Sequence, residues 1–473
     1  MIVKHYFVKK IAHSSYMLMG KKSCIVIDPV RDVDDYIEEA RSYGISITHI
    51  LETHLHADFI SGHMELAART GAQIYAPLKG KCKFKHTAVS EGEGIRVEDI
   101  LIKVVETPGH TPEHVSYVVS DTSRGEDPFG VFCGDTLFVG DVGRPDLFPE
   151  ISNELAGQLF DSLFNKLMKL PDFCEVYPAH GAGSLCGRAM GAKWRTTIGY
   201  ERKYNSTLQL KNKKEFIRSL TTNMPPAPDH FSKCSDINRK GPSLLKDLPE
   251  PEILDVKEFK RRAENKNTII LDTRTYNSFG GQHIPGSINI DLEGNFPTFA
   301  GWVIPPNKKV LLVIDSHEKC SDIVKWLNRV GIDNIAGYLA GGMFEWAKNG
   351  MDTAHIHQLS AKELHSEMNG KMKDLVLIDC RAEGEFKNHN IKGSINIPAP
   401  DMRTRYKELD TKLTYALICS TGHRSSLAAS ILKSRGFANV LNVAGGITGY
   451  SAAGFVPECR ACINIHGSRY HND

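Results

Sequence analysis

The chain has 473 residues, which is too long for one ordinary core, so we expect two to four domains. Its 58 basic and 56 acidic side chains nearly cancel, which gives no general basic field for nucleic acid or a membrane surface. Its apolar runs fall short of the roughly 18 residues that span a bilayer, and its 11 cysteines come without a secretion signal. We therefore expect reduced thiols and a cytoplasmic location.

The first 230 residues contain apolar runs typical of β-strands, such as SCIVIDPV, SITHILETH and ILIKVVETPGH. Histidines and carboxylates follow these runs: His54, His56 and Asp58 in THLHADF, His110 in TPGHTPEH, Asp135 in FCGDTLF and His180 in YPAHG. Side chains at the ends of several strands can meet at one rim of a sheet. The pattern therefore indicates a metal site in this part of the chain.

A proline-rich polar stretch, residues 223–252, is predicted to be an ordered strap or linker. After it the chain repeats itself. LDTRTYNSFGGQHIPGSINI from Leu271 matches IDCRAEGEFKNHNIKGSINI from Ile378 at an offset of 107, and LAGGMFEWAKNGM from Leu339 matches VAGGITGYSAAGF from Val443 at an offset of 104. Short β-branched runs alternate with helical stretches in each copy, which predicts two α/β domains with parallel sheets.

The motifs THLHADF, TPGHTPEH, GDTLF and PAHG resemble the metallo-β-lactamase fold, and GDVGRPD is similar to its glyoxalase II and persulfide dioxygenase branch. The resemblance implies an α/β fold, an αββα sandwich, over residues 1–230. It also implies that His54, His110 and Asp135 bind a single metal. Two imidazoles and one carboxylate with open positions are the ligands of non-haem Fe(II) oxygenases, so we expect one Fe(II) per chain. Zinc could occupy the same ligands in purified protein.

The same resemblance makes His56, Asp58 and His180 groups that orient water or bound ligands around the metal. Cys186 follows His180 by six residues on a glycine-rich loop, so we expect it near the metal or along the path of a sulfur carrier. Two-metal hydrolases of this superfamily have a last histidine in HxHxDH where this chain has Phe59. Single-domain dioxygenases that use glutathione persulfide keep that histidine, so Phe59 weakens a hydrolase function more than it supports an oxygenase.

YALICSTGHRSSLAASILKSRG places Cys419 after an apolar strand and before a helix, where loop amides and the helix terminus favour an anion and hence a nucleophilic cysteine. With IDCRAEGEF upstream and VAGG downstream, this loop resembles the rhodanese family over residues 357–458. The resemblance implies that Cys419 carries sulfane sulfur as a persulfide, with Arg424 and the loop amides stabilising the anion. The other residues of this predicted anion loop are Ser420, Thr421, Gly422, His423 and Ser425.

The first repeat copy has an altered loop. The offset of 104 places Asp315 where the nucleophile should be and Cys320 where Arg424 should be. An acid at that position opposes persulfide formation, so we expect an inactive copy that serves as a spacer or as a dimerisation surface of a homo-oligomer. A CxxC motif near the carboxyl terminus, Cys459 to Cys462, lacks the second pair that a zinc site needs.

The predicted domains are a dioxygenase domain, a linker, an inactive rhodanese-like domain and an active rhodanese domain with a tail, over residues 1–230, 231–252, 253–352 and 357–473. The whole chain resembles bacterial fusions of a persulfide dioxygenase with rhodanese. That resemblance implies oxidation of a small thiol persulfide by dioxygen to sulfite, and sulfur transfer that gives thiosulfate. A zinc thioester hydrolase, a sulfurtransferase with a structural metal domain and a scaffold protein stay as alternatives. The motifs choose neither the thiol nor the direction of the rhodanese step.

Overall fold

The computed structural model describes residues 1–188, 190–222, 224, 226–371 and 374–455, so Cys459 and Cys462 lie outside the described residues. Two compact units make up the chain: Met1–Leu248 with Lys325–Ile332, and Pro249–Val324 with Asp333–Asp473. None of the helices in the described ranges combines the length and the apolar character that a bilayer span requires. The domain boundaries given above stay predictions.

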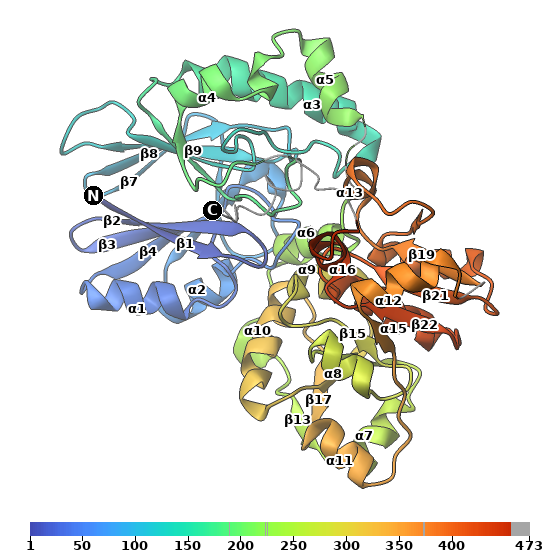
Figure 1. The fold of residues 1–473 in the computed structure, drawn as a ribbon. Coiled ribbons are helices and arrows are strands. Elements are labelled where there is room, and N and C mark those ends of the chain that lie inside the picture. The colour runs from blue at the N-terminus through green and yellow to red at the C-terminus, as the bar shows by residue number, and fades with distance from the viewer. Residues whose placement is uncertain (189, 223, 225, 372–373, 456–473) are drawn as a thin grey trace, which may run out of the picture. The chain divides into compact units, whose positions relative to one another are not determined.

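Two six-stranded sheets form the centre of the first unit (Figure 1). The first sheet has its strands in sequence order: β1 (Ile2–Val8), β2 (His13–Met19), β3 (Ser23–Ile27), β4 (Ser46–Leu51), β5 (Gln73–Pro77) and β6 (Thr87–Val89). The second sheet has the order β12-β11-β10-β9-β8-β7, with β7 (Gly94–Val97), β8 (Ile100–Glu106), β9 (Val115–Asp121), β10 (Gly130–Gly134), β11 (Glu175–Pro178) and β12 (Thr196–Thr197).

Alternate residues of β2 face opposite sides of the first sheet, as the strand period of two requires. Tyr16 and Leu18 lie in the core that the two sheets share, whereas Met17 and Met19 pack on the outer side. The helices of this unit are α1 (Asp34–Ser42), α2 (His63–Thr70), α3 (Ser152–Asp161), α4 (Ile198–Tyr204), α5 (Lys213–Thr221) and α6 (His230–Lys240). α1 and α2 cover the first sheet, and α3 and α5 cover the second, which confirms the predicted αββα sandwich (Figure 1).

The stretch predicted to be an ordered strap contains helix α6 within the first unit. Phe231 and Cys234 of α6 are buried, and Phe231 packs beside Ala57 and Phe138. The proline-rich sequence therefore includes a helix with a packed apolar face, which the composition alone did not indicate.

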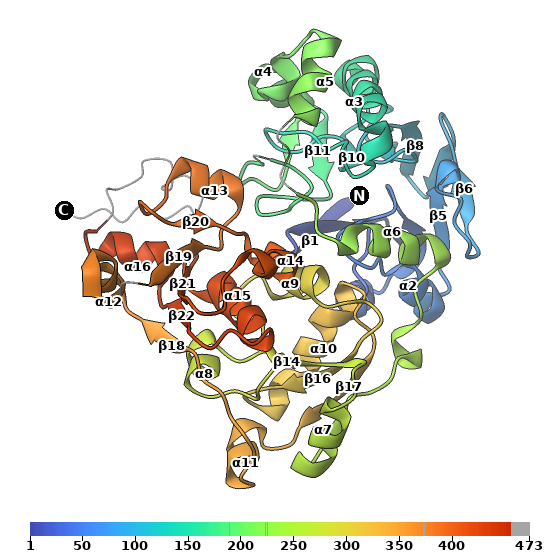
Figure 2. The same ribbon diagram turned by 90° about the vertical axis from the view of Figure 1, so that its right-hand side faces the viewer.

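The second unit contains two parallel five-stranded sheets of the same topology (Figure 2). The first has the order β13-β17-β16-β14-β15, with β13 (Glu252–Leu254), β14 (Thr268–Asp272), β15 (Ile288–Asn289), β16 (Lys309–Val313) and β17 (Ile335–Leu339). The second has the order β18-β22-β21-β19-β20, with β18 (His357–Leu359), β19 (Leu375–Asp379), β20 (Ile395–Asn396), β21 (Thr414–Ile418) and β22 (Val440–Val443). Buried runs such as VLLV in β16 are typical of parallel sheets covered on both faces.

Helices follow the strands in both copies. The first copy has α7 (Val256–Ala263), α8 (Tyr276–Gly281), α9 (Phe296–Val303), α10 (Cys320–Arg329) and α11 (Gly342–Lys348). The second has α12 (Ala361–Ser366), α13 (Glu383–Asn388), α14 (Met402–Arg405), α15 (His423–Ser434) and α16 (Gly446–Ala452). The repeat extends to side chains: Arg274 donates to Asp272 at 2.6 Å, and Arg381 donates to Asp379 at 2.7 Å. The two predicted α/β copies are confirmed.

Candidate functional site

Three predicted metal ligands come together from loops at the ends of strands in the first unit. His54 follows β4, His110 lies between β8 and β9, and Asp135 comes directly after β10. One ligand atom from each lies within 4.8 Å of the others, and all three side chains are buried. The Asp135 Oδ2 atom is 3.3 Å from His110 Nε2 and 3.9 Å from His54 Nε2. The two imidazoles and the carboxylate therefore point at one centre.

Neighbouring groups fix which nitrogen of each imidazole faces that centre. The Nδ1 atom of His110 donates to the carbonyl oxygen of Arg144 at 2.9 Å. The Nδ1 atom of His54 lies 2.9 Å from Thr53 Oγ1, and the Thr53 hydroxyl donates to Asp28 Oδ2 at 2.8 Å. Each ring therefore carries its proton on Nδ1 and leaves the Nε2 lone pair for a ligand.

The protonation of these groups suits a metal ion. Among the described residues, the buried Nε2 atoms of His54 and His110 have no hydrogen-bond partner. A buried polar atom without a partner costs free energy unless a ligand binds it. Burial lowers the pKa of both histidines, which keeps them neutral as metal binding requires. Burial alone would raise the pKa of Asp135, but the charge of the neighbouring His180 outweighs it and holds that pKa below its usual range. His54, His110 and Asp135 are therefore a group that could hold a metal ion.

His114 also belongs to this site, although the sequence analysis assigned it no role. The Asp135 N–H group donates to His114 Nε2 at 3.0 Å, and His114 Nδ1 lies 3.0 Å from Thr107 Oγ1. Burial lowers the pKa of His114 to about 3, so the ring stays neutral and can accept that bond. Its ring stacks on His54 with 4.8 Å between centroids. The second histidine of TPGHTPEH was a signal that could have identified it.

Asp58, His180 and Cys186 form a second buried group, with ligand atoms within 4.8 Å of one another. His180 joins it to the metal ligands, because its Nδ1 lies 2.7 Å from Asp135 Oδ1 and its Nε2 lies 2.9 Å from Asp58 Oδ2. Burial opposes a charge on His180, but Asp135 and Asp58 outweigh it and raise the pKa well above its ordinary value. Burial, with Asp58, raises the pKa of Cys186 to about 12, which keeps the thiol protonated. Their roles toward water or substrate stay predictions.

His56 faces a third buried group. Its Nε2 atom lies 3.2 Å from Asp28 Oδ1 and 3.9 Å from Glu52 Oε2. Burial opposes the charged form, but Asp28 and Glu52 outweigh it and raise the pKa of His56. The ring lies 4.1 Å from the His54 ring and 4.5 Å from the Phe59 ring, measured between centroids. Phe59 thus packs against His56 and belongs to the core on the outer side of the first sheet, and the predicted role of His56 around the metal stays a prediction.

One further carboxylate and one further histidine, Glu52 and His63, lie near this loop and have no motif that could have revealed them. Glu52 accepts a hydrogen bond from the Ser61 hydroxyl at 2.9 Å and lies 3.3 Å from His63 Nδ1. Burial and the nearby Asp28 raise the pKa of Glu52 to about 8. Burial lowers the pKa of His63 to about 3. The loop that carries His54 and His56 therefore packs against a layer of buried polar side chains.

Asn238 of α6 holds the same loop from another side. Its side-chain amide donates to the carbonyl oxygens of His56 and Phe59, both at 2.9 Å, and its carbonyl accepts the N–H of Ser61 at 2.9 Å. Asn238 is 1% exposed. Because it lies more than 170 residues from the loop, sequence spacing gave no signal for this contact.

In the second unit, Cys419 lies between β21 and α15, as predicted, and is 1% exposed. Its sulfur accepts a hydrogen bond from the Gly422 N–H at 3.1 Å and from the Ser425 hydroxyl at 3.4 Å. Gly422 has a φ of 106°, a left-handed conformation that side chains disfavour. The loop therefore turns donors toward the sulfur. Among the other predicted loop residues, Ser420 and His423 are partly exposed and Thr421 is exposed.

Arg424 has a carboxylate partner that the sequence analysis did not assign. Its guanidinium donates to Glu385 at 2.6 and 2.9 Å and to the Ser420 hydroxyl at 2.7 Å. Arg424 therefore joins Ser420 of the cysteine loop to Glu385. The repeat offered a signal for this pair, because the first copy has Ser278 in place of Glu385 and Cys320 in place of Arg424.

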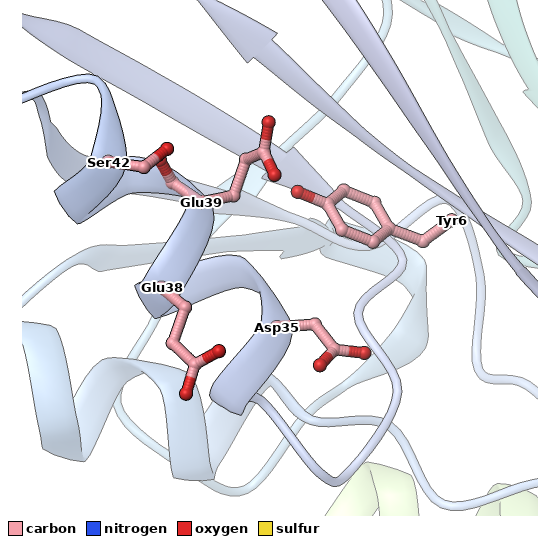
Figure 3. Close-up of a pocket in the computed structure, with 5 residues that line it drawn as sticks. All are labelled: Tyr6, Asp35, Glu38, Glu39 and Ser42. Carbon is pink, nitrogen blue, oxygen red and sulfur yellow. The ribbon is translucent and has the colours of Figure 1, made fainter.

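An open pocket on the surface of the first unit is separate from these groups. It has a volume of about 410 Å³ and lies between β1 and α1, lined by Tyr6, Asp35, Glu38, Glu39 and Ser42 (Figure 3). Its lining holds three carboxylates and neither histidine nor cysteine. The buried histidine groups, which could hold a metal ion, and the cysteine loop lie elsewhere in the chain.

Comparisons with known proteins agree with this division. The metallo-beta-lactamase superfamily model matches residues 9–180, and the rhodanese-like domain model matches residues 255–349 and 360–453. The crystal structure of a metallo-beta-lactamase from Staphylococcus aureus subsp. aureus COL superposes with a TM-score of 0.65 at 34% identity, covering 72% of this chain and 98% of the other.

Two similar proteins have different activities in their names. A hydroxyacylglutathione hydrolase of Rhodospirillum rubrum is 36% identical over 160 residues, which is 33% of this chain and 57% of that protein, so the chain spans less than two thirds of it. The mitochondrial persulfide dioxygenase ETHE1 of Mus musculus is 28% identical over 244 residues, which is 50% of this chain and 88% of that protein. The chain belongs to the metallo-β-lactamase superfamily, and two rhodanese-like domains follow its metallo-β-lactamase domain.

Proposed function

We propose that the protein oxidises a small thiol persulfide to sulfite at the His54, His110 and Asp135 site and transfers sulfane sulfur at Cys419 to give thiosulfate. The observation that carries the proposal is the pairing of the two sites on one chain. A two-imidazole, one-carboxylate centre suits a sulfur-oxidising iron, and a cysteine with donors aimed at its sulfur suits a persulfide carrier. The similarity to a persulfide dioxygenase over 88% of its length supports the first half.

One Fe(II) held by these three residues would supply the redox chemistry that dioxygen requires, which zinc cannot supply. Other residues of the protein orient and surround these three ligands. His180 holds the orientation of Asp135 and links it to Asp58. Phe59, which is fully buried, packs against the His56 ring. Cys186 lies beside Asp58 and His180, within reach of a sulfur ligand at the same centre.

The two proposed steps balance in atoms and electrons. In the first, RSSH, O2 and H2O give RSH and H2SO3, with the sulfane sulfur losing the four electrons that dioxygen gains. In the second, the Cys419 thiolate takes the outer sulfur of another RSSH and releases RSH, and sulfite then attacks the outer sulfur of the resulting Cys419 persulfide. A sulfur–sulfur bond to sulfite forms, the bond to Cys419 breaks, and the Cys419 thiolate leaves. The Gly422 N–H and the Ser425 hydroxyl are positioned to stabilise that leaving thiolate.

A zinc-dependent thioester hydrolase joined to a sulfurtransferase is the second candidate. The 36% identity to a hydroxyacylglutathione hydrolase favours it. Such an enzyme would use a second metal held by Asp58, His180 and Asp135, with Phe59 standing where the superfamily motif has another ligand. We prefer the dioxygenase because Phe59 supplies no ligand at that position, and because the similarity covers 88% of the persulfide dioxygenase but 57% of the hydrolase.

Oxygen uptake tests this choice. Protein loaded anaerobically with iron should consume dioxygen when given persulfides of coenzyme A, glutathione, cysteine or bacillithiol, with about one iron per chain. His54→Ala should lose metal and oxygen uptake, and Cys419→Ser should keep uptake but release sulfite without thiosulfate. His49→Ala, which removes an imidazole outside the site, is the matched control. Two zinc ions per chain with thioester hydrolysis under nitrogen would refute the proposal.

A further inference from the structure

Helix α15, which follows the Cys419 loop, is covered by the first rhodanese-like copy. Its residues 425–432 are buried without a break, so the helix has no free face in this stretch. The Ser426 hydroxyl donates to Asn289 Oδ1 at 2.7 Å, and the Asn289 N–H donates to Ser430 Oγ at 3.0 Å. Asn289 lies in β15 of the first copy, beside α15 (Figure 1). The copy that lacks a nucleophile therefore packs directly behind the loop that has one.

At the start of α15 the contact reaches the loop itself. The Nδ1 atom of His423 lies 3.0 Å from Asp291 Oδ2. The Asp291 side chain is 1% exposed and that of His423 is 30% exposed, so the acid reaches the imidazole from the protein interior. Asp291 is held in turn by the N–H groups of Tyr276 and Glu293, both at 2.9 Å. Burial would raise the pKa of Asp291, but His423 and these N–H donors outweigh it and lower that pKa.

Tyr276 closes the same turn. Its ring meets the His423 ring edge-on, with 5.2 Å between centroids and 86° between planes. A Cβ atom on Gly422 would lie 3.0 Å from the Tyr276 ring, so the tyrosine lies directly against the Gly422 backbone. Gly422 is also the residue whose N–H donates to Cys419 Sγ. Tyr276 and Asp291 thus flank the turn that aims this N–H at the sulfur.

These two residues are particular to the first copy. At the offset of 107, Tyr276 corresponds to Glu383 and Asp291 corresponds to Pro398. The residues that build the fold are the same in both copies, as the Asp272–Arg274 and Asp379–Arg381 pairs illustrate. The shared fold therefore does not explain Tyr276 and Asp291, whereas their contacts with the neighbouring loop do.

We propose that Asp291 and Tyr276 of the first rhodanese-like copy are positioning residues for sulfur transfer at Cys419. They fix the Gly422–His423 turn, so the copy without a nucleophile completes the reactive loop of the other. This differs from the spacer role expected from the sequence. The inference rests on the sulfur-transfer half of the proposed function.

The test compares full-length Asp291→Asn, which removes the charge that holds His423, with Glu293→Gln, which removes an exposed charge on the same turn. The first readout is the rate at which iodoacetamide alkylates Cys419, followed by mass spectrometry of its peptide. The second is transfer of sulfur from thiosulfate to cyanide. A charge-assisted contact corresponds to about a tenfold effect. We expect Asp291→Asn to lower the alkylation rate and kcat about five- to tenfold with little change in KM, and Glu293→Gln to match the wild type.

A double-mutant cycle separates positioning from general destabilisation. Because Asp291 acts through His423, Asp291→Asn should have no further effect in a His423→Gln background. Additive losses, or a wild-type alkylation rate in Asp291→Asn, would overturn the inference. If Asp291→Asn does not fold, His423→Gln alone removes the pair from its exposed side, and an unchanged alkylation rate there would overturn it as well. Absence of sulfur transfer in the wild type would refute the proposed function, and the alkylation rates would still report on the turn.

Discussion

At the scale of single residues, the metal site depends on side chains that touch the ligands as much as on the ligands. Thr53 binds Nδ1 of His54 and the Arg144 carbonyl binds Nδ1 of His110, which leaves the Nε2 atom of each ring free. His114 accepts a hydrogen bond from the N–H of Asp135. Such partners commonly change metal affinity 10–100-fold when they are lost. Neutral imidazoles suit these contacts, because a protonated ring could not accept the bond from Asp135.

Replacing His114 with phenylalanine tests this view. The ring volume is kept, but the buried N–H of Asp135 loses its acceptor and the Asp135 loop can shift. We expect iron affinity to fall about 10–100-fold, measured by competition with a chelator of known affinity. His49→Phe, at a half-buried position on β4 outside the site, should keep wild-type affinity. Equal affinities for wild type and His114→Phe would contradict a positioning role.

At the scale of elements, two helices do more than cover a sheet. The polar stretch predicted to be a strap includes α6, and Asn238 on that helix binds the loop that carries His56 and Phe59. In the second unit, α15 has buried residues all round because a second domain covers it. Each helix links a reactive loop to a distant part of the chain, and each link is a buried side-chain hydrogen bond.

Removing the α6 link should loosen the metal loop. Asn238→Ala leaves two carbonyl groups and one N–H of the loop without partners, which costs about 1–3 kcal/mol for each buried group left unsatisfied. We expect a lower thermal midpoint for apoprotein and a lower iron content after dialysis. Lys240→Ala removes an exposed side chain two residues further along the same helix and serves as the control. Unchanged iron content in Asn238→Ala would mean that the loop holds its shape without α6.

At the scale of the whole molecule, the metal centre belongs to the first unit and Cys419 to the second. The proposed link between them is sulfite, a small anion that can exchange through solvent. The proposed chemistry does not require both steps to occur on the same chain, because sulfite leaves the first site as a free product and can be used at Cys419 of any chain.

Mixing two variants that each lack one of the two activities tests this exchange. Cys419→Ser should release sulfite from a persulfide and dioxygen, and His54→Ala should retain sulfur transfer. Together they should form thiosulfate at a rate well above that of Cys419→Ser alone, which measures the uncatalysed background. Thiosulfate is quantified by chromatography after thiol trapping. A mixture no faster than this background, with both single activities intact, would indicate that sulfite does not pass between chains.

The sequence by itself determined the αββα domain, the two parallel α/β copies, and which residues meet as candidate metal ligands and in the cysteine loop. These features depend on strand and helix periodicity and on motifs whose residues lie close together in the chain. Asp135 and His110 could be assigned together because each lies in a loop that follows a strand of one sheet, where side chains can converge.

Only the tertiary structure showed which residues orient the candidate metal ligands and the cysteine loop. Asp28, Asn238, Tyr276 and Asp291 lie far from the residues they contact and stand in no motif. It also showed that Arg424 binds Glu385 and that His56 faces Asp28. The physical reason is that a hydrogen bond or an ion pair depends on the distance between two groups in space. The separation of two residues along the chain does not predict that distance, which is set only when the core packs.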